Sequence, residues 1–294
     1  MQKRSIGAQA SYWLILPAFL LYTGFVIVPA LSSIYYSLTS WDGISPVMKY
    51  IGLRNYLDMF HSPRFFNALR NTWILTVSIT ILENVTALAL AILVDKIRAL
   101  KSFFRSIFYL PVLLSGIVAG YIWSTMFNYS FGIVNQFLTA VHLNILKLDW
   151  LGHPKIALFS IVITMVWKAA GYFMIIYLAG LQGIPQEMSE AARIDGANSI
   201  EHFRYITFPM LAGAVTINLT LSLISGLRIF DQIVVMTDGG PGFATETLTY
   251  LIFKVAFADL QQGYGTALAM VLFAMILVFG TIQVRLLRRR EVEL

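Results

Sequence analysis

The stretch LQQGYGTALAMVLFAMILVFGTIQV, residues 260–284, carries no charged side chain. An apolar run of about 18 residues or more indicates a transmembrane helix, because about 20 residues rising 1.5 Å each cross a ~30 Å hydrocarbon core. Residues 5–41 and 106–146 are also free of charge. The chain is 58% hydrophobic with a mean hydropathy of +0.73, whereas soluble domains are about 45–50% apolar. The sequence therefore predicts an all-α integral membrane protein.

The hydropathy pattern predicts six transmembrane helices in one membrane domain. The predicted spans are Tyr12–Leu38, Asn71–Val94, Ser106–Phe127, Ile156–Leu178, Met210–Ile229 and Thr266–Leu286. Pro111 falls inside the third span, where neighbouring helices are expected to satisfy the freed backbone carbonyls. Gly116 and Gly120 form a G-x-x-x-G pattern, a common device for packing helices. We divide the chain into a first helix with its outer loop (1–70), a core of five helices (71–286) and a basic tail (287–294).

The distribution of Lys and Arg predicts the orientation. These residues lie in short segments between the apolar runs and not on one soluble domain, which argues against a nucleic-acid partner. With both termini inside, 12 of the 21 bases lie in cytoplasmic segments and 7 in outer ones. The first outer loop, with four bases, argues the other way. The cluster from Lys96 to Arg105 and the Arg-rich tail outweigh it, so both termini are predicted to be cytoplasmic.

One long polar segment interrupts this pattern on the predicted cytoplasmic side. Its sequence is EAARIDGANSIEHFRYITFP, residues 190–209. Pro185 fits the first turn of a preceding helix, and Gly196 is expected to end that helix, since glycine tolerates positive φ. A second short helix is predicted from Ala197. A bent helical pair with small residues and a projecting apolar side chain suits a groove on another protein. The alternative is an amphipathic helix lying on lipid.

The spacing within this segment resembles the EAA loop of ABC importer permeases, whose pattern is E-A-A-x3-G-x9-I-x-L-P. The matching residues are Glu190, Ala191, Ala192, Gly196, Ile206 and Pro209. Phe208 stands where the family has Leu, which keeps the apolar character. The resemblance implies the type I ABC importer permease fold. It also implies that residues 179–209 form coupling helices, which sit in a cleft of a cytoplasmic ATPase subunit.

Further segments are similar to the sugar-type permeases, and in particular to the maltose-type first subunit. They are Asn71-Thr72, AGLQGIPQEMSEAARIDGA (179–197), MTDGGPGFATETLTYLIFKVAF (236–257) and GYGTALA (263–269). This resemblance implies a location in the inner membrane of a bacterial or archaeal cell. It implies as partners a second six-helix permease, two ATP-binding subunits and an extracytoplasmic sugar-binding protein, besides the membrane lipid.

No catalytic motif is found. The sequence lacks a G-x-x-x-x-G-K-S/T loop, and Asp238–Gly242 is expected to be only a turn, because no Lys follows that could reach a phosphate. There is no G-x-S-x-G elbow, and the four His have no metal-ligand spacing. We therefore predict a transport subunit that is not an enzyme and has no metal or cofactor of its own. ATP and Mg²⁺ would be used by the partner ATPase.

Polar residues within the spans are candidates for a substrate path, because they are costly in a membrane. Lys168 is expected near the midplane of the fourth span, by helix rise. It either contacts substrate or forms a structural ion pair with Glu83 or Asp231. Tyr172, one turn further along, either stacks on a sugar ring or belongs to the core.

The fifth span carries a polar stripe. Asn218, Ser222 and Ser225 fall at i, i+4 and i+7 on one helical face. Such a stripe either binds sugar hydroxyls or joins helices to one another. By the resemblance, Tyr172, Ser222 and Gly226 fall at positions where the maltose-type family contacts sugar.

The leading hypothesis is thus the permease subunit of an ATP-driven carbohydrate importer. A secondary transporter or channel that works without ATP is the alternative, but it predicts a relay of acids at the midplane, for which only Glu83 and Asp231 qualify, and internal repeats are not found. An ABC permease for another solute, such as amino acids or phosphate, is also compatible with the EAA loop alone. The DGGP segment favours sugars.

Overall fold

All regular elements in the described part of the chain are helices. The computed structural model describes residues 15–97 and 99–289, and the one β-type pairing among them is an isolated bridge between Thr39 and Tyr50. The chain divides into two compact units. One contains the described residues up to Ser62 together with Ile252–Val271, and the other contains Pro63–Leu251 together with those from Leu272 onward. The all-α prediction is confirmed.

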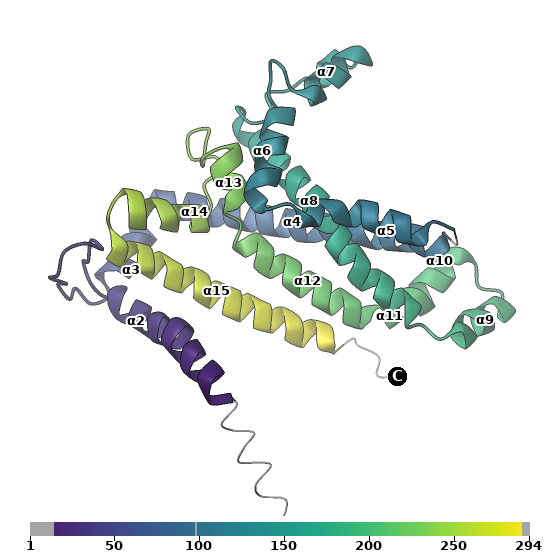
Figure 1. Ribbon diagram of the computed structural model, residues 1–294, viewed down its shortest axis with the longest axis horizontal. Helices are drawn as coiled ribbons and strands as arrows, with labels where there is room; N and C mark the ends of the chain where they lie inside the picture. The colour runs from purple at the N-terminus through teal and green to yellow at the C-terminus, as the bar shows by residue number, and fades with distance from the viewer. Residues whose placement is uncertain (1–14, 98, 290–294) are drawn as a thin grey trace, which may run out of the picture. The chain divides into compact units, whose positions relative to one another are not determined.

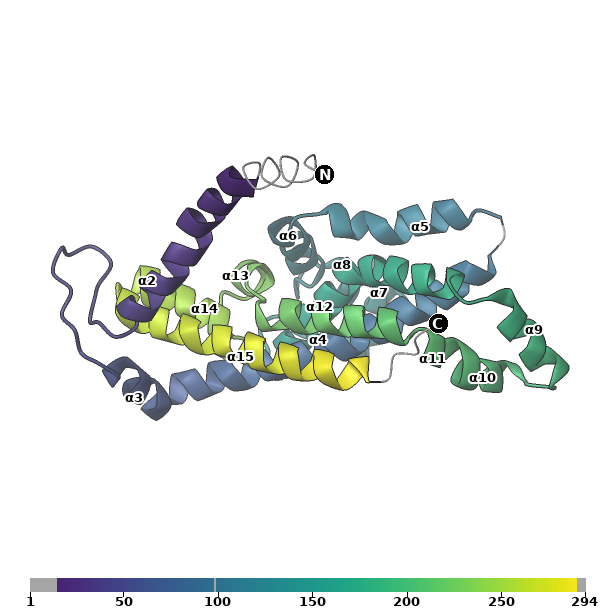
Figure 2. The ribbon, with the colours of Figure 1, turned by 90° about the horizontal axis from the view of Figure 1, so that it is seen from below.

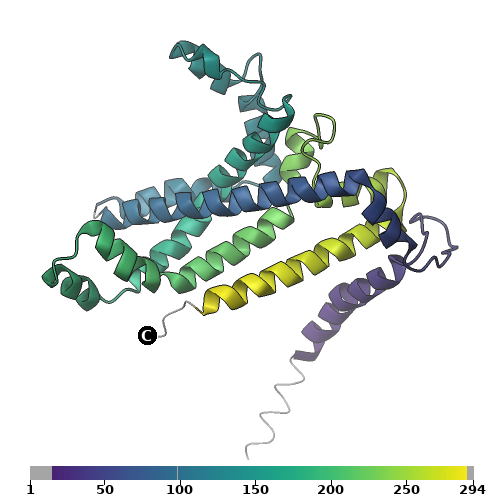
Figure 3. The ribbon, with the colours of Figure 1, turned by 180° about the vertical axis from the view of Figure 1, so that it is seen from behind.

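Three long helices form the centre of the second unit. They are α4 (Pro63–Lys96), α8 (Pro154–Gln182) and α12 (Ala212–Leu227), which lie side by side and contact one another (Figure 1 and Figure 3). Two clusters of buried apolar side chains lie in this unit, one containing Ile79 and the other Met174. Because lipid is as apolar as these side chains, close packing and interhelical hydrogen bonds hold such helices together.

The remaining helices of this unit are short. They are α5 (Lys101–Tyr109), η2 (Leu110–Leu113), α6 (Gly116–Met126), α7 (Ile133–Ala140), η3 (Asn144–Leu146), α9 (Gln186–Ile194), α10 (Ser199–His202), η4 (Phe203–Thr207), α11 (Phe208–Met210) and α13 (Asp231–Met236). Two helices, α14 (Leu248–Phe253) and α15 (Gln262–Arg288), have residues in both units. Within the second unit, α9 and α10 lie at the end away from α13 (Figure 2).

The helices account for the six predicted spans when bent helices are counted. Among the described residues, four helical stretches are long and apolar enough to cross a membrane: Ile15–Tyr36, Pro63–Lys96, Pro154–Gln182 and Gln262–Arg288. Two bent pairs supply the others: Lys101–Leu113 with Gly116–Met126, and Ser199–Met210 with Ala212–Leu227. The predicted start of the first span, at Tyr12, lies outside the described residues.

The third predicted span is not one straight helix. Its two halves meet at an angle of 96° after Leu113. Pro111 lies in the 3₁₀ turn that ends the first half, and Leu114 is extended, with ψ of 140°. Ser115 then caps α6, because its Oγ accepts a hydrogen bond from the amide of Val118 at 3.2 Å. The prediction of a continuous helix was wrong here, since Pro111 and Ser115 end one helix and begin the next.

The fifth predicted span, Met210–Ile229, is also shorter than expected. The helix that packs in the bundle is α12, and the residues before it turn away by 69°. The bend lies at Leu211, which is fully buried and has φ and ψ of −80° and 1°. The polar segment at residues 190–209, which the sequence predicts to be cytoplasmic, is therefore joined to α12 through a bend of 69°.

The G-x-x-x-G pattern of α6 packs against α13, as predicted. A Cβ atom on Gly116 would collide with the carboxylate of Asp231, and one on Gly120 would lie 3.4 Å from the Cβ of Val235. Glycine at these two positions lets the helices approach closely.

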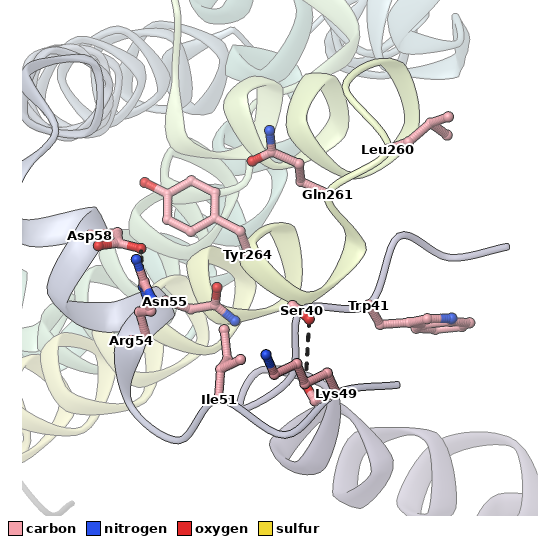
Figure 4. Close-up of a pocket in the computed structure, with 10 residues that line it drawn as sticks. All are labelled: Ser40, Trp41, Lys49, Ile51, Arg54, Asn55, Asp58, Leu260, Gln261 and Tyr264. Atoms are coloured by element: carbon pink, nitrogen blue, oxygen red, sulfur yellow. Dashed lines mark hydrogen bonds and ion pairs between the residues drawn. The ribbon is translucent and has the colours of Figure 1, made fainter. Parts of the chain in front are cut away.

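The first unit contains η1 (Thr23–Ile27), α2 (Val28–Tyr36), α3 (Arg54–His61), η5 (Lys254–Ala258) and the beginning of α15. The buried Asn55 orders the loop after α2, because its amide donates to the carbonyls of Ser37 and Thr39 at 2.8 and 2.9 Å. A pocket of about 410 Å³ opens beside this loop (Figure 4). Tyr264, Gln261 and Asp58 are among the side chains around it.

Candidate coupling segment and substrate path

Helix α9 begins and ends as the sequence predicts. It starts directly after Pro185 and carries Glu187 in its first turn, where an acid is favoured by the helix dipole. The side-chain amide of Gln186 donates to Glu190 at 2.6 Å. Gly196 follows the helix with a φ of +80°, and a Cβ atom there would meet nothing within 4 Å. Glycine is therefore favoured at this turn by backbone conformation and not by space.

The second helix is fixed by a capping box that sequence reasoning missed. The Oδ1 of Asn198 accepts from the amides of Ile200 and Glu201 at 2.9 and 3.0 Å, and Glu201 accepts in return from the amide of Asn198 at 2.8 Å. The spacing N-x-x-E is the sequence signal that would have placed this start. The helix begins at Ser199, two residues after the predicted start.

The α9–α11 segment, residues 186–210, exposes large apolar side chains. Ile194 is 87% exposed, Ile200 77% and Tyr205 67%. Ala191, Ala192 and Ile206 from the EAA pattern line one groove, and Tyr205 lines it as well. Exposed apolar side chains beside a groove are typical of a surface that binds another protein.

The remaining residues of the pattern do not lie in that groove. Glu190 is exposed beside Gln186, Gly196 forms the turn, and Pro209 lies in α11. The α9–α11 segment therefore carries both small residues that line a groove and large apolar side chains that are exposed.

The ends of this segment are joined closely to the bundle. A Cβ atom on Gly180, near the end of α8, would lie 2.8 Å from the Cδ2 of Leu211 and 3.1 Å from the Cβ of Ala214. The helix that enters the segment and the helix that leaves it therefore touch at its base.

The candidates for the substrate path fall into two groups. Tyr172 on α8 is 40% exposed, Lys168 one turn before it is half-buried, and Ser225 on α12 is exposed. Asn218, Ser222 and Gly226, by contrast, are buried inside the chain.

The buried group packs α12 against its neighbours. The hydroxyl of Ser222 donates to the Oε2 of Glu83 at 2.5 Å, and the amide of Asn218 donates to the carbonyl of Phe173 at 3.0 Å. A Cβ atom on Gly226 would lie 2.9 Å from the Cα of Thr76. Of the two interpretations of the stripe, helix packing is what this conformation shows for Asn218 and Ser222.

Glu83 has a different partner from the one expected. It is fully buried, and within the described part of the chain it forms no ion pair with Lys168. Lys168 forms none with Asp231 either. Asn84, which follows Glu83 in the sequence, accepts a hydrogen bond from the hydroxyl of Tyr177 at 2.7 Å. The polar side chains of α4 thus join it to both α8 and α12.

The DGGP segment, residues 236–257, is bound to the first turns of α4 through Glu246 and Leu248. Arg64 binds the carboxylate of Glu246 through two nitrogens, at 2.7 Å from Nη2 and 3.0 Å from Nε, and Glu246 is fully buried. Asn71 donates to the carbonyl of Glu246 at 3.1 Å, and Thr72 accepts from the amide of Leu248 at 2.9 Å. Sequence reasoning singled out Asn71-Thr72 and the DGGP segment but neither paired them nor noticed Arg64.

The turn itself is closed by Tyr250. Its hydroxyl donates to Asp238, and the ring lies where a Cβ atom on Gly239 would come within 2.6 Å of it. Burial raises the pKa of this hydroxyl above its ordinary value. The prediction that Asp238–Gly242 forms only a turn agrees with this geometry.

Comparison with known proteins shows the family to which the chain belongs. Residues 64–292 match the family described as "Binding-protein-dependent transport system inner membrane component", and the chain belongs to it. The chain is 36% identical to the probable starch degradation products transport system permease protein AmyD of Thermoanaerobacterium thermosulfurigenes, over 96% of both chains. It is 34% identical to the trehalose/maltose transport system permease protein MalF of Thermococcus litoralis, over 97% of this chain and 95% of the other.

A solved structure shares the fold. The chain superimposes with a TM-score of 0.84 and 21% identity on a bacterial alginate ABC transporter in complex with an alginate pentasaccharide-bound periplasmic protein, over 96% of this chain and 94% of the other. The resemblance to ABC importer permeases drawn from Glu190–Pro209 is confirmed. The roles of individual residues and the orientation of the termini stay predictions.

Proposed function

We propose that this chain is a permease subunit of an ATP-driven sugar importer. It lines the path together with a second six-helix permease, and it couples to two cytoplasmic ATPases through the α9–α11 segment. The observation that carries this proposal is the exposed apolar face of that segment, with Ile194 and Ile200 projecting from a pattern that resembles the EAA loop. A soluble partner would cover this face.

Sugar as the substrate class is supported by the relatives. Two of them are described as transporting starch degradation products and trehalose or maltose. The structural neighbour was solved with a periplasmic protein that carries an alginate pentasaccharide. We infer that an extracytoplasmic binding protein delivers the sugar to this chain as well.

The coupling follows from the way the segment is attached. An ATPase pair that closes on ATP binds the α9–α11 segment differently in its open and closed states, and only such a difference can shift the permease between two conformations. Because Gly180 and Leu211 hold α8 and α12 together at the base of the segment, the two helices would move together. The free energy comes from the partner, and this chain supplies the path.

The sugar path is proposed along the accessible side chains. Tyr172 offers a ring face, and Lys168 and Ser225 offer polar groups on α8 and α12. Ser222 and Gly226 reach a sugar only if α12 moves away from α4, and Asn218 only if α12 moves away from α8, since all three are buried in this conformation. We therefore propose that they contact substrate only in the conformation that the permease adopts after these helix contacts have opened.

The experiment that tests the proposal is purification of the tagged chain from its native membrane in a mild detergent. We expect a second permease and an ATPase to copurify, and we expect sugar-loaded binding protein to stimulate ATP hydrolysis in reconstituted vesicles. The matched comparison is Glu190→Lys, which reverses a charge on the exposed face of α9 and should reduce the stimulated ATPase. Recovery of the chain alone, where a known ABC complex survives, would contradict the proposal.

A further inference from the structure

A groove runs between α12 and the part of α15 that belongs to the second unit. Its volume is about 460 Å³. Thr220 and Ile224 lie on the α12 side, and Gly280 and Val284 lie on the α15 side. A Cβ atom on Gly280 would meet nothing within 4 Å, so the glycine leaves space in the groove. The edge-on contact of Phe279 with Trp73 of α4, at 4.6 Å between ring centroids, holds this part of α15 on a different helix.

Most of the side chains that line the groove between its ends are apolar, and one end is basic. Arg285 and Arg288, one turn apart on α15, close that end. Both are exposed, and in the described part of the chain neither forms a hydrogen bond or an ion pair. The hydroxyl of Thr220 donates to the carbonyl of Thr216 at 2.7 Å, and Thr281 also lines the groove. The charged groups of the lining are the two guanidinium groups.

The dimensions of the groove match one leaflet of a bilayer. From Ile276 to Arg288 the helix rises through 12 residues, or roughly 18 Å at 1.5 Å per residue. Half of a ~30 Å hydrocarbon core is about 15 Å. When Arg288 lies at the level of the lipid headgroups, Ile276 lies near the midplane. The basic end also lies next to the tail that the sequence predicts to be cytoplasmic.

We propose that this groove is a binding site for an anionic phospholipid of the inner leaflet. The acyl chain lies between α12 and α15, and the phosphate is held by Arg285 and Arg288. Guanidinium groups bind phosphate oxygens through two parallel hydrogen bonds, and basic sites between transmembrane helices at the cytoplasmic side recognise anionic headgroups. The lining contains no amide or carboxylate, and its polar groups besides the two guanidinium groups are the hydroxyls of Thr220 and Thr281.

The test uses the intact transporter, purified and then titrated with phosphatidylglycerol while bound lipid is counted by native mass spectrometry. Phosphatidylcholine serves as the uncharged reference lipid. We expect the wild type to retain phosphatidylglycerol and the variant R285Q/R288Q to bind it about thirtyfold more weakly. The matched control is R289Q, because Arg289 is exposed on the same turn but does not line the groove.

A second variant tests the apolar half of the site. Gly280→Leu fills the space between the helices and leaves both arginines in place, so we expect it to lower phosphatidylglycerol binding as well. Equal retention by R285Q/R288Q and R289Q would overturn the proposal. Loss of the second permease from the complex, in either groove variant, would show instead that the groove is a contact between permeases and would overturn it too.

Discussion

The α9–α11 segment and the contact between α4 and α12 use polar side chains in opposite ways. In the segment, polar groups bind close neighbours, as Gln186 binds Glu190 and Asn198 binds Glu201, and large apolar side chains face outward. In the contact, the hydroxyl of Ser222 binds Glu83, which lies 139 residues away, and both are fully buried. We propose that the first region is a surface covered by another molecule, whereas the polar groups of the second find their partners within the chain.

The largest effect is expected at the turn of the α9–α11 segment. Gly196→Val places a β-branched residue at a φ of +80°, a backbone conformation it cannot adopt without strain of about 1–3 kcal/mol. We expect sugar uptake by membrane vesicles to fall at least about tenfold, since the two helices would no longer hold their bend. Gly196→Asn should retain most of the uptake, because Asn tolerates the left-handed region.

The control for this prediction is Gly213→Val. A Cβ atom at Gly213 also meets nothing within 4 Å, but the backbone there does not have positive φ. Similar uptake by Gly196→Val and Gly213→Val, at equal amounts of inserted protein, would show that the shape of the segment does not matter for coupling.

The next largest effect is expected for the ion pair between Arg64 and Glu246, which lie 182 residues apart in the sequence. Arg64→Gln leaves the buried carboxylate of Glu246 without its bidentate partner, which costs about 3–5 kcal/mol for a fully buried pair and less here, because Arg64 is partly exposed. We expect a clear fall in the thermal unfolding midpoint in detergent. The matched control is Arg54→Gln: its partner Asp58 lies at 3.8 Å in solvent, and exposed pairs contribute about 0–1 kcal/mol. Equal shifts in the two variants would contradict the importance of the Arg64 ion pair.

Comparison of the two regions also explains what could be predicted from the sequence. The helices were predictable because apolar runs and charge-free stretches are local patterns, and the turn at Gly196 was predictable because glycine has a local conformational reason to be there. The bends at Ser115 and Leu211 were missed because hydropathy does not register a change of direction. Pro111 and Pro209 were visible, but the sequence does not say whether a proline kinks a helix or ends it.

The partners of polar side chains were the least predictable part of the candidate site. One of the two interpretations of Lys168 was an ion pair with Glu83 or Asp231, because all three are ionisable groups in or near the spans. Glu83 instead lies against a serine of α12. A pattern at i, i+4 and i+7 shows which residues share a face, but not which helix that face meets. That information exists only after α4, α8 and α12 have packed.

A smaller effect is expected at the cap of α10. Asn198→Ala removes the oxygen that accepts from the amides of Ile200 and Glu201, which costs about 1 kcal/mol. Because this capping box is entirely local, we expect faster cleavage of the α9–α11 segment by protease and an unchanged unfolding midpoint for the bundle. Asn198→Asp, which preserves the acceptor, is the control. A lowered midpoint for the bundle would show that the segment is not independent of α4 and α12.

The smallest effect is expected for the coupling energy between Glu83 and Ser222. Ser222→Ala and Glu83→Gln are combined in a double-mutant cycle, with unfolding free energies measured in detergent. Interhelical hydrogen bonds in membrane proteins contribute about 0.6 kcal/mol on average and up to about 1.7, so we expect a coupling energy in that range.

The same cycle with Ser225→Ala in place of Ser222→Ala should give no coupling, because Ser225 is exposed. Uptake separates the two roles proposed for Ser222. If the residue only joins helices, Ser222→Ala should lower stability and leave the sugar concentration for half-maximal uptake unchanged. If that concentration rises while the Glu83 coupling is zero, Ser222 binds sugar in the transporting state, and the α4–α12 contact is then part of the path.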